Sequence, residues 1–276
     1  MRVAAIVVAY NSARELPESL GCLAALPLAR IVVADNSSTD DSAEVAARYT
    51  PHVQAMPNAG FGASINVAAG TAPDVDAYFL LNPDCRLSGP DFAALVDALD
   101  DDQRLGAVAP QMRYPNGRYG ISSGPEPSIA KEWLAALRAD HLVPGRLKSF
   151  LARSALLRSK VPMLGYLAVG PTPETRPAAW VSGFCMLVRA EAFRDVGGFD
   201  PDFFLYFEDV DICRRLRGRG WQVASVGTSV ADHKESTSTA AVGKRRLYRS
   251  GMNVYFSKHG TWRQRLLARA LGRLPI

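Results

Sequence analysis

The sequence predicts an α/β fold, in which a mostly parallel central sheet carries helices on both faces and a helical extension follows at the C-terminal end. Two observations predict the sheet. Short apolar runs alternate with helical patterns through the first 110 residues, and such an alternation gives parallel strands joined by crossover helices. The first run, residues 3–9, is continuous and rich in β-branched residues, as a strand covered on both faces should be.

The predicted elements follow in order through the first part of the chain. Each strand is a short apolar run, and each helix has apolar residues at helical spacing. The strands are residues 3–9, 30–34, 52–56, 77–81 and 105–109. The helices between them are residues 13–23, 41–49, 62–70 and 91–99. Asn11 or Ser12 is available to cap the first helix.

The remainder of the chain is less regular. Residues 114–127 and 162–177 are rich in Pro and Gly and are predicted to be loops. Residues 128–160, between these loops, have a helical and basic pattern. Regular patterning then returns with a strand at 178–188, helices at 190–196 and 208–219, and a strand at 222–226.

The composition is ordinary for a soluble globular protein: of the 276 residues, 48% are hydrophobic and 21% are charged. No stretch approaches the roughly 18 apolar residues that cross a bilayer. We expect the N-terminal apolar run to be a buried strand rather than a signal peptide, because no small-residue cleavage site follows it. Cys22, Cys85, Cys185 and Cys213 lack the spacing of a zinc site or a disulfide framework, which predicts free thiols in a reducing compartment.

Basic charge is concentrated in residues 236–276, which are predicted to form a basic helical extension. This segment holds nine Lys or Arg and no acid, whereas the whole chain has a net charge of only +5. Such a segment suits an anionic surface or ligand. Nucleic acid is not expected as a partner, because no aromatic platform or reading helix accompanies the charge.

Four polar residues closely follow predicted strands: Asn11, Asp35, Asn58 and Asp84. Ligands of open α/β sheets collect beyond the carboxyl ends of the strands, so we expect these side chains to converge on one site. Asp35, in VADNSSTDDS, can accept hydrogen bonds from a base or a ribose. A helix-capping turn explains the same pattern equally well.

Two further segments suit a diphosphate. PNAGFGASIN places Gly60 and Gly62 in a tight turn before a helix, where a ligand can approach the backbone and the helix N-terminus favours anions. This segment is not a GxGxxG fingerprint, which argues against an NAD enzyme. In FLLNPDC, Asp84 can hold a Mg or Mn ion that bridges to diphosphate oxygens. The alternative for this segment is a plain Asn-Pro-Asp turn.

The segment GGFDPDFFLYFEDVDICRRLRGRGW is the most specific. Its helix begins with Glu208, Asp209 and Asp211 and ends in arginines, a distribution that the helix dipole alone explains. The dipole does not explain the preceding aromatic residues, which give an apolar frame that raises a carboxylate pKa toward the range of a general base. His233 also lies just after a predicted strand. Its side chain is either a ligand of a metal or substrate group or a hydrogen-bonded residue without such a role.

Taken together, these segments resemble glycosyltransferase family 2, and within it the bacterial rhamnosyltransferase-like branch. The matching motifs occur in the family's order and span residues 3–233, although residues 110–177 match poorly. They are IVVAYNS, VADNSSTDDS, NAGFGASIN, LLNPDC, WVSGFCMLVRAEAF, GGFDPDFFLYFEDVDICRRLRGRGW and the later histidine.

The resemblance implies a GT-A glycosyltransferase domain over residues 1–235, with a nucleotide half of about 1–110 and an acceptor half of about 111–235. It implies an inverting reaction by single displacement. Asp209 matches the catalytic base, and Glu208 is the competing assignment. The residues matched to nucleotide and donor binding are Tyr10, Asn11, Asp35, Asn58, Gly60, Phe61, Gly62, Asn66 and Asn82.

The resemblance also implies a divalent cation, Mg or Mn. Asp84 matches the metal-binding acid of the DxD-type motif, with Asn82 in place of the first acid, and His233 is similar to the family's additional metal or diphosphate ligand. Trp180, Ser182 and Gly183 match the stretch beside the acceptor and the donor sugar.

The same branch indicates dTDP-L-rhamnose as the donor, in preference to UDP-galactofuranose, UDP-glucose or UDP-N-acetylglucosamine. It indicates a polyprenyl-diphosphate-linked sugar as the acceptor, in cell-wall or polysaccharide assembly, and therefore a cytoplasmic protein that is peripheral on the inner face of the cell membrane. Residues 128–160 and 260–274 mix Leu and Arg as an interfacial helix does, although a solvated basic face gives the same pattern.

Three alternatives stay open. A soluble acceptor also fits the sequence. A homodimer is neither indicated nor excluded. The alternative of another class is a non-catalytic partner subunit on a degenerate transferase fold.

Overall fold

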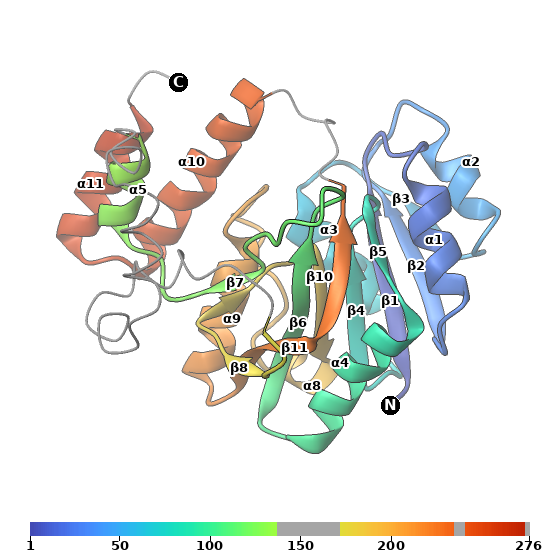
Figure 1. The fold of residues 1–276 in the computed structure, drawn as a ribbon. Coiled ribbons are helices and arrows are strands. Elements are labelled where there is room, and N and C mark those ends of the chain that lie inside the picture. Colours follow the sequence, from blue (N-terminus) through green and yellow to red (C-terminus); the bar gives the residue numbers. More distant parts are fainter. Residues whose placement is uncertain (137–171, 235–240, 274–276) are drawn as a thin grey trace.

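The computed structural model describes residues 1–136, 172–234 and 241–273 (Figure 1). Within these ranges nine strands form one sheet, in the order β3-β2-β1-β4-β10-β6-β11-β5, with β8 paired to β11. The strands are β1 Val3–Ala9, β2 Arg30–Asp35, β3 Val53–Ala55, β4 Ala77–Leu81, β5 Cys85–Leu87, β6 Leu105–Arg113, β8 Arg176–Pro177, β10 Cys185–Arg189 and β11 Gln222–His233. A separate pair joins β7 Ser123–Gly124 to β9 Trp180–Val181.

Strands β3, β2, β1 and β4 are parallel, and β6 is parallel to β11. Strand β10 lies antiparallel between β4 and β6 and joins these two parallel groups. The predicted α/β class with a mostly parallel sheet is confirmed. The four cysteines are free thiols, as predicted, and all but the half-buried Cys22 are buried.

Helices cover both faces of the sheet. Helices α1 Leu16–Ala24, α2 Ser42–Ala47 and α4 Gly89–Asp101 pack on one face, and α3 Phe61–Gly70, α8 Ala190–Asp195 and α9 Glu208–Gly218 pack on the other. Each face has its own apolar core, because the strands point alternate side chains to opposite faces. In β1, for example, Val7 belongs to the first core and Ile6 to the second.

Three further helices gather at one end of the molecule, away from α1 and α2 (Figure 1). They are α5 Ile129–Ala136, α10 Ala241–His259 and α11 Trp262–Gly272. A third apolar core joins them to the segment that enters α9, through Phe203, Phe207 and Tyr255 among others. The predicted C-terminal helical extension is therefore confirmed, and it packs against the main domain. The division of the domain into two halves stays a prediction.

The strand expected at residues 178–188 is divided into β9 and β10. The chain turns between them, where the N–H of Ser182 donates a 2.8 Å hydrogen bond to the carbonyl of Ser122, outside the main sheet. Strand β11 extends beyond its predicted end to His233, and its register shifts between Val226 and Val230. This extension pairs with β5, a short strand that local sequence did not predict because its pairing is long-range.

Of the helix expected at 128–160, the part at Ile129–Ala136 is observed as α5, and residues 137–160 lie outside the described residues. None of the helices in the described part of the chain is both long and apolar enough to span a membrane.

Candidate active site

A cavity of about 380 Å³ opens at the carboxyl ends of the parallel strands. Tyr10 follows β1, Asn36 follows β2 and Asn82 follows β4, and all three line it. Such placement is typical of ligand sites in open α/β sheets. The predicted nucleotide and metal residues that line this first cavity are Tyr10, Asn58, Gly60, Phe61, Asn82 and Asp84.

Asn11, Asp35, Gly62 and Asn66 do not line the first cavity. Asp35 is buried beside it; its Oδ2 accepts a 3.3 Å hydrogen bond from the N–H of Ser38, and its Oδ1 has no partner among the described residues. A buried carboxylate oxygen without a partner is costly, so Asp35 retains one acceptor for a ligand. Its role in nucleotide binding stays a prediction.

The side chains of Asn11 and Asn66 are engaged with the backbone. Oδ1 of Asn11 accepts a 2.8 Å hydrogen bond from the N–H of Thr39, which ties the end of β1 to the turn after β2. The amide of Asn66 donates to the carbonyl of Phe199 and accepts from its N–H, at 2.7 and 2.8 Å. These contacts give both residues a structural explanation, and a donor contact by either one stays a prediction.

The glycines of PNAGFG allow a close approach of another part of the chain. Gly60 has a φ of +101°, and a Cβ there would collide with the backbone of Phe204. A Cβ on Gly62 would lie 2.7 Å from Cβ of Phe199. The N–H of Phe61 donates a 3.0 Å hydrogen bond to the carbonyl of Phe204. The glycine turn thus holds the aromatic segment that precedes α9.

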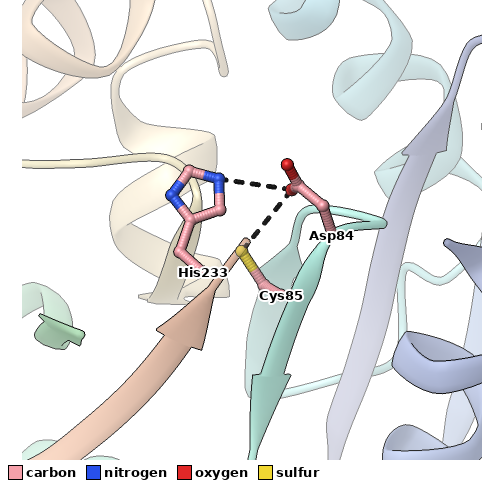
Figure 2. A group of neighbouring side chains, drawn as sticks. All are labelled: Asp84, Cys85 and His233. Carbon is pink, nitrogen blue, oxygen red and sulfur yellow. Dashed lines mark hydrogen bonds and ion pairs between the residues drawn. The ribbon is translucent and has the colours of Figure 1, made fainter. Parts of the chain in front are cut away.

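Asp84 and His233 come together although 149 positions of sequence separate them (Figure 2). The antiparallel pairing of β5 with β11 sets His233 opposite Cys85, so that Nε2 of His233 lies 3.3 Å from Oδ1 of Asp84. The ring of Phe184 stacks on the imidazole with centroids 5.3 Å apart and holds its orientation. The structure therefore brings the two predicted metal ligands together, with Asp84 on the wall of the first cavity and His233 beside it.

The donor set fits a divalent cation. The group that could hold a metal ion comprises Asp84, Cys85 and His233. The carboxylate oxygen suits Mn or Mg, which leave their other positions to water and substrate phosphates, and the imidazole nitrogen is a borderline donor that suits a transition-metal cation better than Mg. Burial raises the pKa of the Cys85 thiol well above its usual value. Mg and Mn also prefer harder donors to a soft sulfur, so Asp84 and His233 are the better ligands.

The turn into α9 is strained. Tyr206 and Phe207 both have positive φ, +68° and +69°, a conformation that costs a bulky residue on the order of 1 kcal/mol or more. Packing compensates for this cost. The ring of Tyr248, on α10, contacts the ring of Phe207 at 5.1 Å, and Gly251 of the same helix lies against the carbonyl of Tyr206. Helix α10 thus holds the turn that presents the next two carboxylates.

The carboxylate of Asp209 is held by main-chain donors. The N–H of Gly183 donates to its Oδ2 at 3.0 Å, and the N–H of Val210 donates to its Oδ1 at 2.8 Å. Burial nevertheless raises the pKa of Asp209 above its usual value, against the effect of these hydrogen bonds. A held carboxylate with a raised pKa is suited to accept a proton.

Glu208 has a different environment. Burial, reinforced by the neighbouring Asp209, raises the pKa of Glu208 well above its usual value. Its side chain is buried, and its Oε2 has no partner among the described residues. Asp209 lines a cavity and Glu208 lines none of those described. Geometry therefore favours Asp209 over Glu208 as the base.

The cavity that Asp209 lines is a second one, of about 190 Å³. The predicted residues Trp180 and Ser182 line it too. Gly183 lies between the two cavities: a Cβ there would be 3.2 Å from the ring of Phe61, on the wall of the first, and 3.6 Å from Cβ of Asp209. The carboxylate therefore stands where the two cavities approach each other.

Glu132 and Tyr248 are among the residues of the second cavity that sequence reasoning missed. Glu132, from α5, is buried, and its Oε2 accepts a 3.1 Å hydrogen bond from the hydroxyl of Tyr248, from α10. A buried acid in an otherwise basic helical segment is the signal that could have singled out Glu132. Tyr248 carries no comparable signal, because its place depends on how α10 packs.

Solved structures of low sequence identity share this fold. The mannosyltransferase PcManGT from Pyrobaculum calidifontis, in complex with GDP-Man and Mn²⁺, aligns with a TM-score of 0.60 at 16% identity, over 98% of this chain and 69% of that one. GalNAc-T7 with UDP, GalNAc and Mn²⁺ aligns with a TM-score of 0.61 at 13% identity, over 98% of this chain and 54% of that one. The fold is that of the GT-A glycosyltransferases.

Sequence comparison identifies the family. Residues 4–162 match the model for Glycosyl transferase family 2, and residues 171–253 match the model for Glycosyltransferase like family 2. The chain belongs to glycosyltransferase family 2. It is 33% identical over 222 residues to an N-acetylglucosaminyl-diphospho-decaprenol L-rhamnosyltransferase of Mycobacterium tuberculosis, covering 76% of this chain and 67% of the relative. The resemblance to the bacterial rhamnosyltransferase-like branch is confirmed.

Proposed function

We propose that this protein is an inverting glycosyltransferase that moves L-rhamnose from dTDP-L-rhamnose to a hydroxyl of a polyprenyl-diphosphate-linked sugar. The observation that carries the proposal is the position of Asp209 where two cavities approach each other, with a raised pKa and a carboxylate held by the N–H of Gly183. The first cavity takes the nucleotide-sugar, and the second takes the acceptor.

Asp209 is the base in this proposal. It removes the proton from the acceptor hydroxyl while the resulting oxygen attacks the anomeric carbon from the face opposite the diphosphate. The bond from the sugar to the diphosphate breaks in the same displacement, so the anomeric configuration inverts. Burial supports this role, because a carboxylate with a raised pKa is a stronger base than an exposed one.

Asp84 and His233 would hold a divalent cation, Mg or Mn, on the diphosphate side of the first cavity. When bound, such a cation supplies positive charge that stabilises the diphosphate leaving group. Support comes from the 3.3 Å approach of the two side chains and from their hard and borderline donor atoms. Asn82, on the same wall, provides a neutral amide where a second acid would otherwise stand.

The choice of sugar and acceptor rests on the mycobacterial relative, whose name specifies L-rhamnosyl transfer to N-acetylglucosaminyl-diphospho-decaprenol. The second cavity supports a sugar acceptor, since the aromatic side chains of Trp180, Tyr206 and Tyr248 line it together with the carboxylates of Asp209 and Glu132. Aromatic faces with a few polar groups are characteristic of specific small-molecule sites. UDP-sugar donors and a soluble acceptor are the alternatives within this class.

The first experiment is a calorimetric binding panel of dTDP, UDP, GDP and NAD, each with manganese and with EDTA. We expect metal-dependent binding of dTDP. Preference for UDP would keep the transferase and change the donor. Binding of none by the folded protein would contradict the proposal and favour the non-catalytic partner subunit, an alternative against which the presence of Asp35, Asp84 and Asp209 already argues.

The second experiment is transfer from dTDP-L-rhamnose to a short-chain polyprenyl-diphosphate-linked N-acetylglucosamine, with the product's anomeric configuration determined by NMR. Inversion at the anomeric carbon is expected. Retention of configuration would contradict the mechanism, and transfer only to a soluble aglycone would contradict the acceptor.

A further inference from the structure

Helix α11 exposes an apolar stripe to solvent. Trp262 is 66% exposed and Leu266 is 55% exposed, and Ala270 is also exposed. Because these residues are spaced by four, they lie along one side of the helix. The opposite side contributes Ala268 and Leu271 to the third core. The helix therefore has one apolar face that is buried and a second that faces outward.

Arginines flank the outward stripe. At about 100° per residue, Arg263 lies on one side of the line from Trp262 to Leu266, and Arg265 and Arg269 lie on the other. All three are exposed, and the guanidinium of Arg263 lies 5.3 Å from the ring centroid of Trp262. No acid occurs from residue 236 to the end of the chain. Among the described residues none of these three arginines forms an ion pair, and apolar anchors bordered by such basic charge suit the interface of an anionic bilayer.

Helix α5 continues this surface. The indole of Trp133 donates a 3.2 Å hydrogen bond to the carbonyl of Leu267, which joins α5 to α11. Leu134 and Leu267 are both exposed large apolar residues, and the two helices lie side by side in Figure 1. The surface of Trp262, Leu266, Leu267 and Leu134 with its flanking arginines is called the outer face of α11 and α5 below.

The outer face adjoins the acceptor cavity through the same helix. Residues Lys131 and Glu132 of α5 line that cavity, the next residue, Trp133, donates its hydrogen bond to α11, and Leu134 is exposed. Helix α5 therefore contributes to both the second cavity and the outer face, through residues that are adjacent in sequence. A molecule anchored in a bilayer under the outer face could therefore extend its polar end toward Asp209.

We propose that the outer face of α11 and α5 lies on an anionic phospholipid bilayer, with Trp262 and Leu266 at the boundary of headgroups and acyl chains and the arginines beside lipid phosphates. The binding of this face to a bilayer does not depend on the proposed function. Only the link between bilayer binding and access of a lipid-linked acceptor to the second cavity rests on that function. A homodimer through this face is disfavoured, because a two-fold axis would set the same basic surface against itself.

The experiment is co-sedimentation of the full chain with vesicles of phosphatidylcholine alone or mixed with phosphatidylglycerol, without donor or acceptor. We expect binding to the anionic vesicles that weakens as salt rises. The double variant Trp262→Glu with Leu266→Glu should bind roughly tenfold or more weakly, since it loses two apolar anchors and gains two repelled charges. The matched control is Val67→Glu on α3, at 55% exposure in the wild type, which should bind normally.

A second readout separates this inference from the proposed function. The double variant should transfer normally to a short-chain, water-soluble acceptor and lose transfer to an acceptor embedded in anionic vesicles. A chain that binds vesicles as expected but transfers no sugar would contradict the proposed function and leave the surface intact. Equal binding to neutral and anionic vesicles, or unchanged binding by the double variant, would overturn the inference. The inference would also be overturned if the double variant converted a dimer to a monomer without loss of vesicle binding, because the face would then be a dimer interface.

Discussion

The main-chain N–H of Gly183 donates a 3.0 Å hydrogen bond to Oδ2 of Asp209. Gly183 belongs to the turn between β9 and β10, whereas Asp209 lies in the first turn of α9. The same glycine leaves just enough room for the ring of Phe61, on the wall of the first cavity. One residue without a side chain therefore holds the carboxylate and lies between it and the first cavity.

The raised pKa of Asp209 predicts the acid side of the pH–rate profile. Transfer requires the deprotonated carboxylate, so the rate should fall as pH drops through the raised pKa, above the value of about 3.9 for an exposed Asp. Steady-state kinetics across pH, with protein stability measured in parallel, checks this. A rate that stays flat down to about pH 4 would show that Asp209 is not the base.

Glu208→Gln should stabilise the protein at neutral pH. Burial raises the pKa of Glu208 in the folded state above the ordinary value of 4.5, so the wild type loses stability as the pH rises from that ordinary value toward the folded-state pKa, and the neutral amide avoids this loss. We expect a gain of at least about 1 kcal/mol at neutral pH, shrinking as the pH falls and Glu208 becomes protonated. Denaturant unfolding at neutral and acidic pH measures it. An equal difference at both pH values would contradict the explanation.

Asp84→Ala and His233→Ala should each weaken metal-dependent binding of the donor nucleotide, because each removes one of the two proposed protein ligands. A variant at the neighbouring position 85 serves as the control. Cys85→Ala should leave the manganese dependence of nucleotide binding unchanged, because manganese prefers oxygen and nitrogen donors to a soft sulfur. Calorimetry with and without EDTA makes the comparison. Cation dependence that survives in Asp84→Ala would remove this residue from the metal site.

Gly251→Ala should destabilise the protein although alanine favours helices. The new methyl group would press on the carbonyl of Tyr206, at the strained turn before α9, and overpacking of this kind costs about 1–3 kcal/mol. Gly21→Ala in α1 is the matched control: no described atom lies within 4 Å of its Cβ, so it should stabilise by roughly 0.5–1 kcal/mol. Thermal unfolding of both variants tests this. Equal shifts in Tm would refute the proposed clamp by α10.

Much of the fold could be predicted from the sequence, because its main elements are locally encoded. The strand at residues 77–81 is observed with its predicted bounds, and β1 likewise matches residues 3–9. The short strand β5 and the antiparallel place of β10 could not be predicted, since both depend on pairing with distant strands. The packing of α10 against the turn before α9 is similarly a tertiary contact.

For the candidate site, the sequence identified residue types better than it identified their contacts. Asp84 and His233 were expected as ligands of one ion, and the pairing of β5 with β11 brings them together. The expected ligand space at Gly60 and Gly62 is filled by Phe204 and Phe199. A sequence motif shows that a residue needs a small side chain, but only the fold shows which neighbour needs the space.

The central claim is that Asp209 removes the acceptor proton, and Asp209→Asn tests it most directly. The amide keeps an oxygen for the N–H of Gly183 and cannot take a proton at neutral pH. We predict that transfer falls by roughly 10²–10⁴-fold while the affinity for dTDP with manganese stays near that of the wild type. Wild-type turnover by the folded variant would contradict the assignment.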